Sequence, residues 1–101
     1  MRGDSKMKVG LIKGRHAVPA EVKDYIFEHD IPQDHVTDAE YMYDIAEDAI
    51  MRFMTQDLEI YVTGFTPALC AVLKACKTYN ISVSCWHYDR EGRTFWKQEV
   101  L

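Results

Sequence analysis

Short apolar runs alternate with segments of helical period along this chain, and this alternation constrains the fold more than any other feature. Residues 8–12, 58–62 and 81–88 read as strands, because they are short and rich in side chains that suit a pleated sheet. Strands separated by helices pair in parallel through right-handed crossovers. We therefore expect an α/β fold: a small three-layer sheet, mostly parallel, finished by an antiparallel edge hairpin.

The first helix is expected to begin at Pro19, a residue that suits a first helical turn. Apolar side chains then recur at helical spacing as far as His29. Pro32 disfavours a helical conformation at Ile31, so this helix is expected to end before residue 31. A short strand at residues 35–36 is expected to follow.

Two further helices have clearer boundaries. Residues 37–40 match the capping-box pattern, and an apolar stripe continues from there to Phe53. The third helix is expected over residues 67–78, with the hydroxyl of Thr66 as its cap and Pro67 in its first turn. Its small and apolar side chains predict close packing against the sheet.

The last segment reads as a hairpin. Residues 89–93 form a polar loop in which Gly92 is available for a positive φ, and residues 94–100 return as a strand antiparallel to residues 81–88.

Length and charge limit the function classes. The chain has 101 residues, enough for one domain, which we assign to residues 7–101 after a loose leader at residues 1–6. Its net charge of −4 argues against a protein that coats long nucleic acids. No apolar run approaches the roughly 20 residues that a membrane span needs, and the start lacks a signal-peptide core.

The three cysteines, Cys70, Cys76 and Cys85, match no zinc spacing and lie in apolar stretches. They read as buried free thiols, which indicates a reducing, cytoplasmic setting. The four histidines lack the spacing of a metal centre, so neither a metal nor a cofactor is predicted.

The candidate binding residues follow three of the predicted strands. In an open parallel sheet, ligands bind at the carboxyl ends of the strands, so these segments are expected to meet at one edge. The candidate ligand-binding residues are Lys13, Gly14, Arg15, His16, Thr63, Gly64, Phe65, Thr66, His87, Tyr88 and Arg90.

These residue types suit an anionic ligand. The free amides of a helix N-terminus hold phosphate, Gly64 permits close backbone approach, and Lys13 and Arg15 neutralise charge. The structural alternative is a capped helix after a tight turn, and this reading is favoured when the Thr-Gly turn is considered alone. A structural role is likewise favoured for His87, as a satisfied histidine at the core margin.

Over nearly the whole length, the chain resembles a group of small, mostly uncharacterised phage and prophage proteins. The matching blocks are IKGRHAVP at residues 12–19, YVTGFT at residues 61–66 and HYDREGRTFWKQEV at residues 87–100. This resemblance implies a phage origin and carries little function.

Residues 58–100 also resemble CRISPR-associated Rossmann-fold (CARF) domains and small ring nucleases. That resemblance implies a Rossmann-like homodimer that binds cyclic oligoadenylate at the strand ends. The implied residues are Thr63, Gly64, Phe65 and Thr66 at the phosphate, with Lys13, Arg15 and His16 on the neighbouring loop.

The leading hypothesis is therefore a phage anti-defence protein that sequesters or slowly cleaves a cyclic oligonucleotide or related nucleotide signal. Whether it is an enzyme stays open; cleavage would follow a metal-independent ring nuclease route, with His16 as the candidate general acid. The alternative is a protein–protein inhibitor of a host enzyme, acting through the acidic face of residues 38–48. A third hypothesis is a structural dimer without a ligand.

Overall fold

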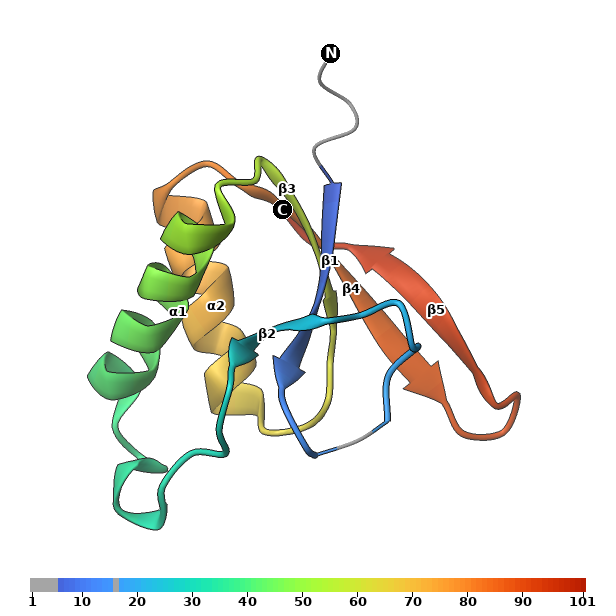
Figure 1. Ribbon diagram of the computed structural model, residues 1–101, viewed down its shortest axis with the longest axis horizontal. Helices are drawn as coiled ribbons and strands as arrows, with labels where there is room; N and C mark the ends of the chain where they lie inside the picture. Colours follow the sequence, from blue (N-terminus) through green and yellow to red (C-terminus); the bar gives the residue numbers. More distant parts are fainter. Residues whose placement is uncertain (1–5, 16) are drawn as a thin grey trace.

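The computed structural model describes residues 6–15 and 17–101 and contains one mixed sheet and two α-helices (Figure 1). The strands lie in the order β2-β1-β3-β4-β5. The pairs β1–β2, β1–β3 and β3–β4 are parallel, and β4–β5 is antiparallel. The predicted fold class, a mostly parallel α/β sheet with an antiparallel edge hairpin, is confirmed. The elements are β1 (Lys6–Ile12), β2 (Asp24–Phe27), the 3-10 helix η2 (Gln33–His35), α1 (Ala39–Phe53), β3 (Asp57–Tyr61), α2 (Thr66–Thr78), β4 (Ser82–Asp89) and β5 (Thr94–Glu99).

Both helices cover the same face of the sheet (Figure 1). Leu58 and Ile60 of β3 and Val83 and Cys85 of β4 alternate toward this face and join the buried side chains of α1 and α2 in one core. The described chain therefore has one layer of helices and one layer of sheet, where three layers were expected. None of the helices in the described residues is long and apolar enough to cross a membrane.

The missing layer is the helix predicted from Pro19 onward, and that prediction is wrong. Residues 24–27 pair with β1 as the edge strand β2, in the register Val9↔Asp24 and Gly10↔Tyr25. A side chain at position 10 would lie 2.4 Å from the ring of Tyr25, so Gly10 makes room for this ring on the helix-free face. The helical spacing of the apolar residues is thus overridden by sheet pairing.

Three further local predictions differ from the structure: the strand at residues 35–36, the cap of α1 and the residue of positive φ in the hairpin. Residues 35–36, expected as a strand, are instead the last residue of the 3-10 helix η2 and its C-cap, and the His35 ring stacks on Tyr41 with centroids 3.9 Å apart. Asp38, not Thr37, caps α1, because its Oδ1 accepts a hydrogen bond of 3.0 Å from the amide of Tyr41. In the β4–β5 hairpin the positive φ belongs to Arg93, at 52°, and not to Gly92.

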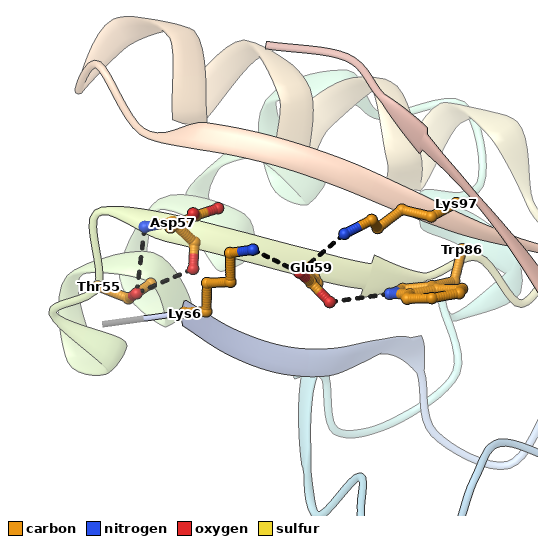
Figure 2. Close-up of polar contacts among 6 residues, drawn as sticks. All are labelled: Lys6, Thr55, Asp57, Glu59, Trp86 and Lys97. Atoms are coloured by element: carbon orange, nitrogen blue, oxygen red, sulfur yellow. Dashed lines mark hydrogen bonds and ion pairs between the residues drawn. The ribbon is translucent and has the colours of Figure 1, made fainter. Parts of the chain in front are cut away.

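The helix-free face of the sheet carries a buried carboxylate, Glu59, which is 3% exposed. Its Oε1 accepts a 2.9 Å hydrogen bond from the indole Nε1 of Trp86, and its Oε2 lies 3.7 Å from Lys6 Nζ and 3.6 Å from Lys97 Nζ (Figure 2). The ring of Trp86 also stacks on Tyr61, with centroids 5.6 Å apart.

These contacts decide the charge state of Glu59. Burial alone would raise the pKa of the Glu59 carboxyl, but the hydrogen bond from Trp86 and the charges of Lys97, Lys6 and Lys8 together lower it below its ordinary value. The carboxylate is therefore ionised at neutral pH, and its stabilising contribution is lost only as the pH falls through this lowered pKa.

We predict that Glu59→Gln loses about 2 kcal/mol of unfolding free energy at pH 7, because the charge-assisted contacts are lost. The difference from wild type should shrink below about pH 4, where the unfolded chain and then the native carboxyl take up protons. Urea unfolding at a series of pH values measures this, with the exposed Glu28→Gln as control. A difference that stays constant with pH would contradict the role of the ionised carboxylate.

Candidate functional site

An open groove lies at the carboxyl edge of the sheet, on its helix-free side. Its volume is about 830 Å³, within the range of small-molecule sites. Three segments far apart in the sequence form it: the loop after β1, the turn after β3 and the β4–β5 hairpin. The lining residues are Ala17, Val18, Pro19, Val62, Thr63, Gly64, His87, Tyr88, Arg90 and Phe95.

The structure brings some of the predicted site residues together. Thr63 and Gly64 from one predicted segment meet His87, Tyr88 and Arg90 from another in this groove. The other candidates that the structure describes do not line it, and His16 lies outside the described residues. The candidates that lie elsewhere are Lys13, Gly14, Arg15, Phe65 and Thr66.

Arg15, expected to neutralise a phosphate, is instead held by a carboxylate. Its Nε and Nη2 lie 2.9 Å and 2.8 Å from Oδ1 of Asp30, and its guanidinium lies over the Phe65 ring at 5.3 Å. The hydrogen bond from Arg15 is the largest of the contributions that lower the pKa of the Asp30 carboxyl. The pair fastens the loop after β1 to the segment that follows β2. Lys13 and Gly14 are exposed in the same loop.

Thr63 has a structural role that the sequence did not indicate. The side chain is 2% exposed, and its hydroxyl both accepts from the amide of Ile12 and donates to the carbonyl of Ile12, each at 3.2 Å. These two bonds tie the ends of β1 and β3 together just beyond their paired residues. The Thr63 hydroxyl is thus engaged within the protein, and its contact with a ligand stays a prediction.

The turn after Thr63 reverses the chain into α2 through two residues of positive φ, Gly64 at 94° and Phe65 at 57°. Phe65 is the N-cap of α2 and makes no side-chain capping bond, so the expected cap at Thr66 is also wrong. Since a bulky residue rarely adopts this conformation, the turn is strained at Phe65. Gly64 suits the turn without that cost.

Two aromatic residues line one side of the groove, and the sequence analysis predicts only one of them, Tyr88. Tyr88 was a candidate and is 53% exposed; Phe95, which was not named, contacts Tyr88 at 5.2 Å and Tyr61 at 5.0 Å between ring centroids. Tyr88 and Phe95 are register partners across the hairpin. The position of Phe95 beside Tyr88 can be predicted from the hairpin register, because directly opposed residues of an antiparallel pair point to the same face of the sheet.

His87 lies at the groove but has a partner of its own. Its Nε2 is 2.9 Å from Oε1 of Gln98, and its ring is 4.8 Å from the ring of Trp96. These contacts agree with the structural interpretation of this histidine.

The acidic face of α1 is partly neutralised within the chain. Asp48 lies 3.4 Å from Nε of Arg52, and Glu47 accepts a hydrogen bond from the hydroxyl of Tyr79.

On α2, Cys70 is exposed, so the expectation of three buried thiols holds only for Cys76 and Cys85. The described residues contain no group of three or more histidine, cysteine or acidic side chains placed to hold a metal ion.

Comparison of the chain with protein-family models, with curated proteins and with solved structures finds no match. The function is therefore argued from the groove itself.

The two bonds of Thr63 generate a prediction. Thr63→Val keeps the side-chain volume and removes the hydroxyl, and we expect a loss of about 2 kcal/mol in unfolding free energy, because a buried donor and a buried acceptor lose their partner. Urea unfolding measures the change. The same substitution at the exposed Thr66 is the control and should leave stability nearly unchanged. An equal loss in both variants would contradict the structural role of the Thr63 hydroxyl.

Proposed function

We propose that the protein binds a nucleotide-type ligand, of the cyclic oligonucleotide or related second-messenger class, in the carboxyl-edge groove. The observation that carries this proposal is the combination of an exposed tyrosine, an arginine and a glycine turn around one cavity at the strand ends. In the biological setting that the sequence resemblance suggests, a phage product would sequester a defence signal in the host cytoplasm.

Each part of a nucleotide has a suitable group in the groove. Tyr88 offers an exposed ring for stacking on a base, and the edge contact with Phe95 supports that ring. Arg90 offers a planar fork for phosphate oxygens. At Gly64 the backbone has no side chain, so a ligand can approach the main chain of the turn.

A binding role fits these residues better than metal-independent phosphodiesterase activity. Cleavage needs a group that is free to transfer a proton, and Nε2 of His87 is already within hydrogen-bond distance of Gln98. We therefore propose sequestration as the main activity.

A thermal-shift screen against cyclic oligoadenylates, cyclic dinucleotides and ADP-ribose derivatives tests the proposal. A ligand present at 100 times its dissociation constant should stabilise the wild type by about 2.7 kcal/mol. Tyr88→Ala should weaken binding by about 1–3 kcal/mol through the lost stacking, and Arg90→Ala should also weaken it.

Two kinds of control sharpen this screen. Arg52→Ala removes an arginine from α1, and Arg15→Ala removes one that is held by Asp30, so both should bind like wild type. Charge reversal at Asp44 tests the protein–protein inhibitor hypothesis and should leave ligand binding unchanged. The proposal is wrong if no member of the panel stabilises the protein, or if Arg52→Ala and Arg90→Ala weaken binding equally.

A further inference from the structure

The outer edge of β5 is a sheet edge that, among the described residues, no other strand pairs. Figure 1 shows β5 at the side of the sheet away from α1 and α2. All its residues except Phe95 are exposed, and β5 is longer than β2 at the other edge, with six residues against four. Unpaired strand edges carry free backbone donors and acceptors that can pair with another strand.

The hydrogen bonds of the hairpin show which backbone groups of β5 point outward. Val100 donates from its amide to the carbonyl of Val83 at 2.9 Å, and the carbonyl of Trp86 faces β3, where it accepts from Val62. Because backbone groups alternate along a strand, the even-numbered residues of β5 face β4. The amides and carbonyls of Phe95, Lys97 and Glu99 therefore point outward.

The side chains along this edge are self-complementary. If two copies of β5 run antiparallel about a two-fold axis at Gln98, Lys97 of each copy meets Glu99 of the other. The backbone amides and carbonyls of Lys97 and Glu99 both point outward from β5. In this register they join the two backbones through about four hydrogen bonds. Trp96, which is 51% exposed, then lies opposite Val100, which is 39% exposed.

We infer that the partner of the β5 edge is a second copy of this chain, paired antiparallel with Gln98 opposite Gln98. The two-fold axis is perpendicular to the sheet, so the two sheets join into one and both helix layers lie on the same side. Complementary charges meet at both Lys97–Glu99 positions, and such cross-strand pairs stabilise a sheet.

Charges on an edge strand often serve the opposite purpose, to prevent pairing. In the inferred dimer, the charges of Lys97 and Glu99 instead favour the register with the axis at Gln98 over neighbouring registers. Shifting the axis by one residue to Lys97 would place Lys97 opposite itself and Phe95 opposite Glu99, which is unfavourable. Moreover, Lys97 Nζ is 3.6 Å from Glu59 Oε2 and 5.6 Å from the centroid of the Trp86 ring, so the Lys97 side chain stands on the helix-free face, where Glu99 of the other copy would also lie in this register.

Sedimentation velocity over a range of concentrations tests the inferred dimer. A small interface predicts a dimer that forms as concentration rises. Glu99→Lys places like charges at both cross-strand positions and should raise the dimer dissociation constant about tenfold. Glu91→Lys makes the same charge change in the exposed hairpin turn and should dimerise like wild type. A wild type that stays monomeric, or a dimer equally sensitive to both changes, overturns the inference.

A cysteine crosslink tests the register directly. In a Cys70→Ser background, which removes the exposed thiol, Gln98→Cys places two sulfurs across the axis at a Cα separation of about 4.5 Å, within the range of a disulfide. Mild oxidation should give a covalent dimer in high yield. Thr94→Cys, far from the axis, should give little. Equal yields from the two variants, or none from Gln98→Cys, overturn the register.

Discussion

A single buried carboxylate, Glu59, joins side chains from four strands on the face of the sheet that has no helices. Its contacts reach Lys6 on β1, Trp86 on β4 and Lys97 on β5, while Glu59 itself lies on β3. A helix would normally cover such a face with apolar side chains. Here a charged network, with the aromatic rings beside it, covers the sheet instead, so one helix layer is enough for a chain of this length.

This arrangement leaves the helix-free face open at the carboxyl edge. The loop after β1 contributes Ala17, Val18 and Pro19 to one side of the groove, and the hairpin contributes Tyr88 and Phe95 to the other. A helix between β1 and β2 would pack where this loop and the ring of Tyr25 now lie. The groove thus depends on a connection from β1 to β2 that forms no helix in its described residues.

The sequence predicted the elements whose local and tertiary preferences agree. The amphipathic stripe of α1 and the β4–β5 hairpin were found because spacing and turn residues point to the same structure. The edge strand β2 was missed, because its apolar residues also fit a helix and only pairing with β1 decides between the two. Of the site, the convergence of Gly64, Tyr88 and Arg90 followed from the expected parallel pairing, which brings strand ends to one edge. The pairing of Arg15 with Asp30 depends on the position of β2, which the sequence did not predict.

The double hydrogen bond between Ile12 and Thr63 spans 51 residues of sequence. On the ribosome, β1 therefore emerges well before the strand that becomes its central neighbour, and β2 is the first partner that it meets. Contacts of such long range are slow to form, because the intervening chain must first be closed into a loop. Until β3 leaves the exit tunnel, β1 presents one unpaired edge, so the nascent chain passes through a stage in which half of its parallel sheet awaits synthesis.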